Sequence, residues 1–300
     1  MSLTRRKRFT IALAFLMIIT AITLNISKPG TANSTVKVQL CMVLDGSGSI
    51  SSDDWQTIVE GVADAIRNNL PHDGSVELTI VQFGYDAPTY AKVEIPPTVI
   101  TDANYETIAS DVENIPQSGG MTPMAHGLYL GWKTIKESNN FTVAERQVIN
   151  LATDGVPNVR NGNATSDLDG DYDIDEYDDV IAVVDKAVSQ GLDELDMEGI
   201  NIGSDAVNWF RDYVLRPQPG HVAPPFIPGW IMVVADAQEF ADTVGEKFEI
   251  VIEGPPPEKP VGGAVFSINV FAVAAPWMLA ALAAIVIAVW ILMKRGYIWS

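Results

Sequence analysis

Residues 36–49 read VKVQLCMVLDGSGS, an apolar stretch followed by an acid and then by alternating glycine and serine. Apolar and β-branched residues dominate Val36–Leu44, which favours a buried β-strand. Glycines at 46 and 48 allow a tight turn after it. Asp53–Leu70 then places its apolar residues at helical spacing. A buried strand, a short loop and a helix in this order predict the first unit of an α/β sheet.

The same alternation of strands and helices continues to about residue 250. Further strands are expected at 75–83, 90–95, 146–153, 198–203 and 230–235, the second of these at an edge. Further helices are expected at 102–115, 123–137, 177–190 and 237–247. Strands separated by helices predict a doubly wound α/β fold, in which a mainly parallel sheet is covered on both faces.

The composition supports a globular domain and excludes one class of partner. Of 300 residues, 47% are hydrophobic and 19% are charged, which is enough apolar material for a sizeable core. The 38 acids and 19 bases give a formal net charge of −19. Such a surface repels polyanions, so we expect no nucleic-acid partner. Cys41, the single cysteine, excludes an internal disulfide framework.

The amino-terminal end has the layout of a secretory signal. Four consecutive bases at 5–8 precede the 18 uncharged residues Phe9–Ile26. This layout predicts a signal segment at 1–26, and both a cleaved signal peptide and a retained signal anchor fit it.

The carboxyl-terminal end predicts a membrane anchor. Val270–Met293 is a run of 24 uncharged residues, long enough for a transmembrane helix. Two bases open the tail 294–300 and place it in the cytoplasm. A proline- and glycine-rich linker at 254–263 precedes the span. We therefore expect a domain at 36–253 that is extracellular and attached to the cell membrane.

Several side chains with hydroxyl or carboxylate oxygens lie on loops, and two of them directly follow an expected strand. Asp45, Ser47 and Ser49 alternate along the first loop, and Asp154 directly follows the strand at 146–153. Thr122 lies on another glycine-rich loop. Because open α/β sheets bind ligands beyond the carboxyl ends of their strands, these side chains are expected to converge. Hydroxyls and carboxylates without nitrogen or sulfur suit a hard cation such as Mg²⁺, Mn²⁺ or Ca²⁺.

Three short motifs resemble the von Willebrand factor A domain family. They are Asp45-Gly-Ser-Gly-Ser-Ile50, Gly119-Gly-Met-Thr-Pro123 and Ala152-Thr-Asp-Gly-Val156, within a matching pattern over roughly 36–250. The resemblance implies a six-stranded sheet with one antiparallel edge strand, and it implies the metal-ion-dependent adhesion site of that family.

In that site Ser47, Ser49 and Thr122 would touch the metal. The resemblance further implies that Asp45 and Asp154 bind it directly or through water. An Asp or Glu carboxylate of a protein partner would then fill the open coordination position.

Residues 161–179 form an acidic insert, with eight acids between Asp167 and Asp179. Counted from Thr165, the spacing resembles an EF-hand calcium loop in which threonine replaces the first aspartate. The candidate ligands of this second, calcium site are Thr165, Asp167, Asp169, Asp171, Asp173 and Glu176. A calcium loop of another type and a purely solvated acidic surface are the alternatives.

We expect a non-enzymatic protein for cell adhesion or ligand binding. One alternative is a structural component of the cell envelope, in which metal only stabilises the fold. The other is a metal-assisted hydrolase, which is disfavoured because no general base stands beyond the aspartates assigned to metal and no Gly-x-Ser-x-Gly nucleophile elbow occurs. The short anchor and tail fit a prokaryotic surface protein, an archaeal one included.

Overall fold

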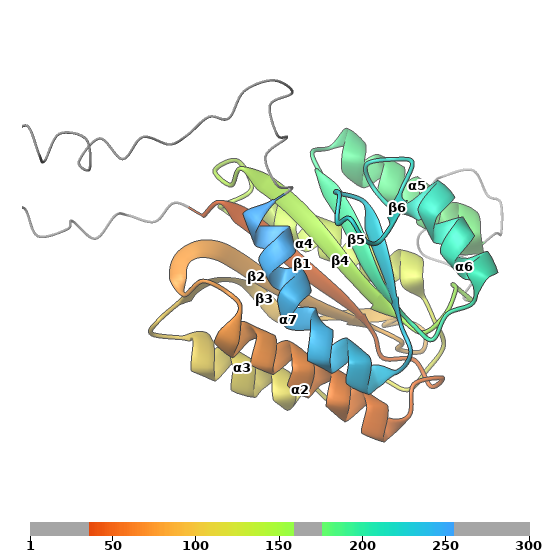
Figure 1. Cartoon of the computed structure of the whole chain (residues 1–300), viewed down its shortest axis with the longest axis horizontal. Coiled ribbons are helices and arrows are strands. Elements are labelled where there is room, and N and C mark those ends of the chain that lie inside the picture. Colours follow the sequence, from red (N-terminus) through yellow and green to blue (C-terminus); the bar gives the residue numbers. More distant parts are fainter. Residues whose placement is uncertain (1–35, 159–175, 255–300) are drawn as a thin grey trace, which may run out of the picture. The chain divides into compact units, whose positions relative to one another are not determined.

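A seven-stranded sheet lies at the centre of the computed structural model, which describes residues 36–158 and 176–254 (Figure 1). The strand order is β3-β2-β1-β4-β5-β7-β6. The strands are β1 (Val38–Asp45), β2 (Asp73–Phe83), β3 (Ala91–Thr101), β4 (Arg146–Thr153), β5 (Glu194–Ile200), β6 (His221–Val222) and β7 (Trp230–Val234). Neighbouring strands are parallel except at one edge, where β3 runs antiparallel to β2.

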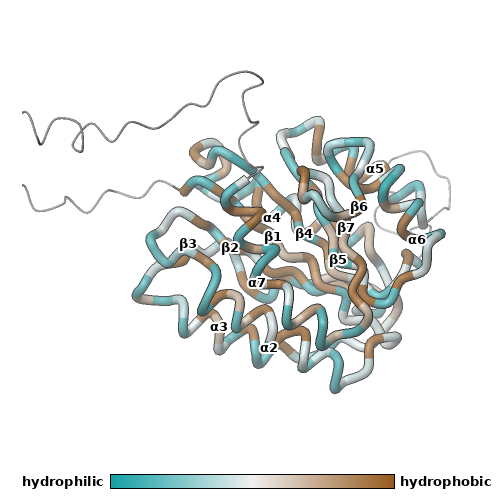
Figure 2. The backbone as a smooth tube through the Cα atoms, viewed as in Figure 1, coloured by the Kyte–Doolittle hydropathy of each residue, from teal (hydrophilic) through white to brown (hydrophobic). Residues whose placement is uncertain are grey.

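Helices cover both faces of this sheet (Figure 1). The helices are α2 (Ser52–Asn68), α3 (Tyr105–Glu113), α4 (Met124–Glu137), α5 (Glu176–Ser189), α6 (Ser204–Trp209), the short π-helix η1 (Phe210–Val214) and α7 (Ala237–Glu253). One core cluster lies between the sheet and α2, α3 and α7, and a second lies under α4 and α5. In Figure 2 the central strands are mostly hydrophobic, while the helices alternate between hydrophobic and hydrophilic segments. The doubly wound, mainly parallel α/β fold is thus confirmed.

The sheet differs from the expected six strands by the addition of β6. This strand has only two residues and lies in a proline-rich segment. Proline lacks the backbone N–H needed for a strand ladder, so the segment pairs with β7 over two residues and then leaves the sheet. The expected strand at 198–203 was displaced as well, because β5 begins at Glu194 and buries all of its residues.

Other expected boundaries were wrong as well, and the helix expected at 237–247 continues to Glu253. The helix expected from 102 begins at Tyr105, because Asn104 turns the chain by accepting hydrogen bonds from the Thr101 amide and hydroxyl. The strand expected to end at 95 continues to Thr101 through two prolines, which an edge strand tolerates. Helices α6 and η1 were not expected at all.

Glycine at position 61 allows α2 and α7 to pack closely. A Cβ atom there would lie 2.5 Å from Cα of Ala241. Each helix is capped at its amino end by a side chain, since Ser51 accepts from the Asp54 amide and Asp236 accepts from the Glu239 amide. The pair therefore forms a closely packed layer over one face of the sheet.

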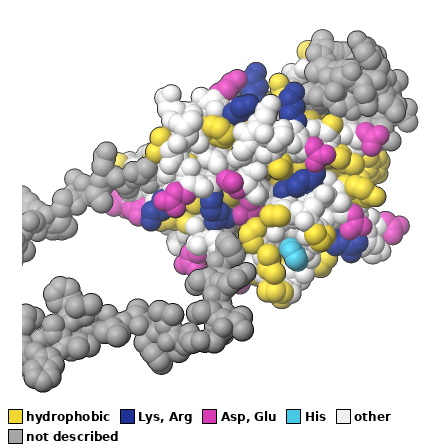
Figure 3. Space-filling model, turned by 90° about the horizontal axis from the view of Figure 1, so that it is seen from above, with side chains coloured by type: hydrophobic (Ala, Val, Ile, Leu, Met, Phe, Trp, Pro, Cys, Tyr) yellow, Lys and Arg dark blue, Asp and Glu magenta, His cyan; other side chains and the backbone are white. Residues whose placement is uncertain are grey.

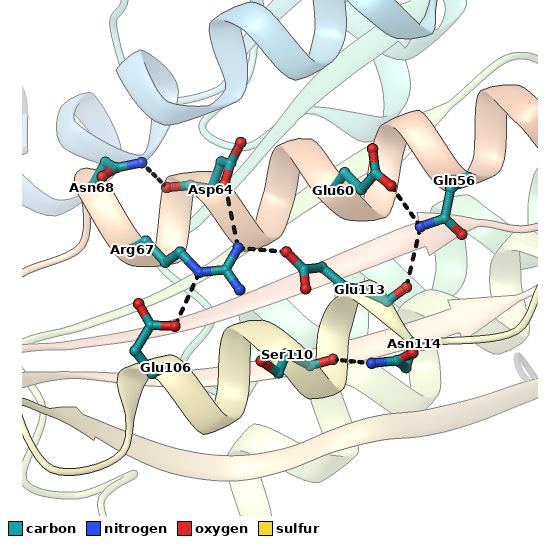
Figure 4. A network of polar contacts seen from close by, with 9 residues as sticks. All are labelled: Gln56, Glu60, Asp64, Arg67, Asn68, Glu106, Ser110, Glu113 and Asn114. Atoms are coloured by element: carbon teal, nitrogen blue, oxygen red, sulfur yellow. Dashed lines mark hydrogen bonds and ion pairs between the residues drawn. The ribbon is translucent and has the colours of Figure 1, made fainter.

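Arg67 of α2 ties that layer to α3 (Figure 4). Its guanidinium lies 3.3 Å from Glu106 and 2.5 Å from Glu113, both on α3, and 3.3 Å from Asp64 of its own helix. The hydrogen bond from Arg67 lowers the pKa of the Glu113 carboxyl. Partly exposed pairs of this kind contribute about 0.2–1 kcal/mol each.

Although acidic residues outnumber basic ones, individual basic side chains form ion pairs with acidic ones. On the face shown in Figure 3, Lys and Arg side chains lie among acidic and hydrophobic ones. Arg146 pairs with Glu194, and Arg216 pairs with Asp185. These pairs offset part of the repulsion between the carboxylates of the domain.

No helix among the described residues is both long and apolar enough to span a membrane. The spans expected within 1–26 and at 270–293, the tail 294–300 and nearly all of the linker 254–263 lie outside the described residues. Those assignments stay predictions.

Candidate metal centre

The ends of β1 and β4, neighbouring parallel strands, bring Asp45 and Thr153 together. Asp45 is 2% exposed, and both of its carboxylate oxygens accept hydrogen bonds. Oδ1 accepts a hydrogen bond from the Ser47 amide at 3.0 Å, and Oδ2 accepts one from the Thr153 hydroxyl at 2.6 Å. Asp45 therefore fixes the first loop against the strand that leads to Asp154.

Hydroxyl groups join Asp45 to Asp154 across the two loops. The Oγ atoms of Ser47 and Ser49 lie 3.0 Å apart. Ser49 Oγ donates to Oδ1 of Asp154 at 2.9 Å. Four of the five residues expected from the sequence thus form one continuous chain of hydrogen-bonding contacts.

The fifth residue, Thr122, lies on a loop that packs directly on the first. The Gly48 amide donates to the Gly120 carbonyl, and the Gly119 amide donates to the Gly46 carbonyl, both at 2.8 Å. A Cβ atom at position 48 would lie 2.8 Å from the Gly119 oxygen, so this approach requires glycine. Thr122 itself is 5% exposed. The backbone contacts bring its loop beside the serine loop.

Two glutamines and a serine that sequence reasoning missed hold these loops in place. Gln117 Nε2 donates to the carbonyls of Ser47 and Ile50, at 3.1 and 2.8 Å. The Ser118 hydroxyl donates to the Gly46 carbonyl at 2.8 Å, and its amide donates to Oε1 of Gln82 at 2.7 Å. No local pattern marked these residues, because they act on the backbone of loops that are distant in sequence.

Asn158 connects the Thr122 loop to the Asp154 loop. Its side-chain Oδ1 accepts a hydrogen bond from the Thr122 backbone amide at 2.7 Å, and the Asn158 backbone amide donates one to the Thr122 carbonyl at 3.3 Å. It follows Asp154 by four residues, so one loop both carries a candidate ligand and positions another. An asparagine in a Gly/Pro turn is too weak a sequence signal to predict this contact.

The two carboxylates make this edge of the sheet electronegative. Burial raises the pKa of Asp45 to about 6, against the lowering effect of its hydrogen bonds to Thr153 and Ser47. Burial also raises the pKa of Asp154, against its hydrogen bond from Ser49. No base among the described residues pairs with either group. A cation bound here would stabilise both charges.

The donor set fits a hard cation. The groups that meet are hydroxyls and carboxylates, which suit Mg²⁺, Mn²⁺ and Ca²⁺. Over residues 36–158 and 176–254, no cluster of three or more His, Cys, Asp and Glu side chains could hold a metal ion. Any ion at this edge would therefore depend on the serine and threonine hydroxyls in addition to the two aspartates.

The second, calcium site expected at the acidic insert is not tested. Its candidate ligands Thr165, Asp167, Asp169, Asp171 and Asp173 lie outside the described residues. Glu176 is the first residue of α5. The site stays a prediction.

The von Willebrand factor type A domain model matches residues 39–195, more than half of the chain. The chain belongs to this family. No curated protein sequence matches it significantly.

Solved structures with the same fold include three pilus proteins. The pilus adhesin SpaC of Lactobacillus rhamnosus GG is 15% identical with a TM-score of 0.54, over 72% of this chain and 31% of its own. The PilB minor pilin of Streptococcus sanguinis is 16% identical with a TM-score of 0.53, over 74% and 64%. The von Willebrand domain of the type V pili tip protein of Porphyromonas gingivalis is 12% identical with a TM-score of 0.51, over 74% and 98%. This chain thus spans about a third of the SpaC chain.

Replacing Asn158 by alanine is expected to loosen the Thr122 loop. The Thr122 amide loses its acceptor, so its hydrogen exchange should rise about fivefold, corresponding to a net bond of about 1 kcal/mol. Asn158→Asp keeps the accepting oxygen and is the matched control. Hydrogen–deuterium exchange of the peptide that contains Thr122 measures the effect. Equal protection in wild type and Asn158→Ala would show that Asn158 does not position this loop.

Proposed function

We propose that this chain is a cell-surface adhesion protein whose domain binds a divalent cation and, through it, a protein partner. Mg²⁺ is the leading candidate, with Mn²⁺ and Ca²⁺ as alternatives. The proposed ligands are Asp45, Ser47, Ser49, Thr122 and Asp154. An Asp or Glu carboxylate of the partner would complete the coordination.

The hydrogen-bonded chain from Asp45 through Ser47 and Ser49 to Asp154 carries this proposal. This chain of contacts brings oxygen atoms that can bind a metal together from two loops at one edge of the sheet. Three of the five proposed ligands are neutral hydroxyls, and both oxygens of Asp45 already accept hydrogen bonds. A divalent ion held in this way would keep positive charge toward solvent and attract an anionic group of a partner.

The two ends of the domain lie far from the proposed metal centre, at the opposite end of β1. Lys37 and Val38 line one cavity together with Glu253 and Gly254, so the domain begins and ends at the same place. These residues lie at the amino end of β1, whereas Asp45 lies at its carboxyl end. The segment that leads to the proposed anchor thus leaves the domain at the end of β1 opposite to the proposed metal centre.

The shared fold of three pilus proteins supports an extracellular, adhesive role. Their identity to this chain is low, so the support concerns the scaffold and not the partner. We propose a non-enzymatic role, since no basic side chain among the described residues hydrogen-bonds to Asp45 or Asp154.

Replacing Asp154 by alanine is expected to weaken Mg²⁺ and Mn²⁺ binding by at least about tenfold, because a charged ligand is lost. The fold should persist, since Asp154 is half-buried and lies beyond the end of β4. Calorimetric titration of the full chain in detergent measures the affinity. Asp111→Ala, which removes an exposed acid from α3, is the matched control. Unchanged affinity in the Asp154 variant would contradict the proposed centre.

Protease added to intact cells is expected to release a fragment that contains residues 36–250. The positive-inside bias places the bases at 294–295 in the cytoplasm and the domain outside. Immunoblotting of the supernatant detects the fragment, and a cytoplasmic protein serves as the control for cell integrity. Protection of the domain until the cells are lysed would reverse the assigned orientation.

A further inference from the structure

A cavity lies beside the proposed metal centre, where the amino ends of α2 and α7 meet the carboxyl ends of β5 and β7. Its volume is about 190 Å³, more than ten times the ~10–15 Å³ that one water molecule requires. Ser49 and Asp154, two of the proposed metal ligands, are among its lining residues. A partner group that completed the metal shell would therefore lie next to this cavity.

Isoleucine side chains form the apolar part of the cavity lining. Ile50 and Ile200 are each 6% exposed, and Ile58 is 2% exposed. All three belong to the core cluster under α2, α3 and α7, so packing from behind holds them in place. Methylene groups placed against them would leave water, which favours binding. This part of the lining thus suits the aliphatic stem of a side chain.

Two acidic side chains form the exposed part of the lining. Asp54 of α2 and Asp236, the residue that caps α7, are both exposed. Asp54 accepts a hydrogen bond from the Ser51 hydroxyl at 2.7 Å, and Asp236 accepts one from the Glu239 amide at 2.9 Å. Neither forms an ion pair with a base among the described residues. Their charges are available to a ligand.

The surroundings of the cavity stay negative when the helix dipoles and a bound metal are included. Helix α2 has Asp53 and Asp54 in its first turn, and α7 has Asp236 as its cap and Glu239 in its first turn. The two helix amino ends oppose these four carboxylates with about +0.5 each, which leaves a charge of roughly −3. A divalent cation would be balanced by its two proposed aspartate ligands. The cavity therefore attracts a cationic group and repels an anionic one.

The separation of these acids favours an organic cation over a second metal ion. Within 36–158 and 176–254, no three His, Cys, Asp or Glu side chains are grouped so that they could hold a metal. A metal ion needs all of its ligands at about 2.0–2.6 Å. An ammonium or guanidinium group instead offers several N–H donors, which reach acceptors that lie apart, and it carries an aliphatic stem.

We infer that this cavity receives a lysine or arginine side chain of the protein partner, next to the carboxylate that completes the metal shell. The inference rests on the proposed metal-dependent adhesion and defines the chemistry of the partner more closely. The aliphatic stem packs on the three isoleucines, and the charged head pairs with Asp54 and Asp236. A partner that presents an acid beside a base is then preferred over one that presents an acid alone, because the second gains only the metal contact.

Methyl NMR of the full chain in detergent tests the cavity directly, because three isoleucines line it. The chain, labelled at its isoleucine methyl groups and saturated with Mg²⁺, is titrated with Nα-acetyl-lysine methylamide. Saturable shifts are expected at Ile50, Ile58 and Ile200. The norleucine derivative keeps the aliphatic stem without the ammonium and should bind at least about threefold more weakly, since it loses two exposed ion pairs. Added salt should reduce this difference, because exposed charges are screened.

Substitutions of the two acids provide the matched variants. Asp236→Asn keeps an oxygen that caps α7, and Asp54→Asn changes an exposed side chain, so both should leave the fold intact. The double variant should bind the lysine and norleucine derivatives equally well. Asp111→Asn, which removes an exposed acid from α3, should keep the wild-type preference for lysine.

Equal binding of the two derivatives by the wild type would overturn the inference, because the cavity would then be a purely apolar site. Shifts confined to isoleucines elsewhere, or no shifts, would overturn it too. Calorimetric titration of the same preparation with Mg²⁺ separates the two proposals. A chain that binds Mg²⁺ but not the lysine derivative loses this subsite and keeps the metal centre. A chain that binds the lysine derivative but no Mg²⁺ loses the metal centre, and with it the paired recognition inferred for the partner.

Discussion

The hydrogen bond from the Thr153 hydroxyl to Asp45, 2.6 Å long, joins the ends of the two central strands. It exists because β1 and β4 are parallel neighbours in register, so their carboxyl ends meet at one edge. The loops that leave this edge carry Asp45, Ser47, Ser49 and Asp154 into contact. If the pairing of β1 with β4 changed, these four side chains would separate, and the metal centre proposed from them could not form.

The molecule places ionisable side chains in buried or half-buried sites, in two different settings. At the sheet edge, Asp45 and Asp154 lack a basic partner, and a divalent cation would satisfy them. In the core, Glu198 and Lys247 are fully buried without forming an ion pair, and burial raises the pKa of the acid and lowers that of the amine. Both settings are subject to the same constraint, which is the cost of burying an uncompensated charge.

Much of the scaffold could be predicted because apolar periodicity is local. The strand expected at 146–153 matches β4, and the helices expected at 123–137 and 177–190 match α4 and α5 to within one residue. The start of β5 was missed because Glu194, Asp196 and Glu198 alternate with apolar residues and look like a solvated face, yet all three are buried. The contacts of Asn158 and Gln117 were missed because they depend on loops that meet only in the folded chain. Residue type thus identified the candidate ligands, whereas tertiary structure determined what holds them in place.

Anomalous diffraction from crystals grown with Mn²⁺ tests the central claim most directly. The account predicts one strong manganese peak at the carboxyl edge of the sheet, bounded by oxygens of Ser47, Ser49, Thr122 and Asp154. The direct metal–oxygen distances should be about 2.0–2.6 Å. An empty edge at saturating Mn²⁺, or a peak bound only by acids elsewhere on the surface, would contradict it.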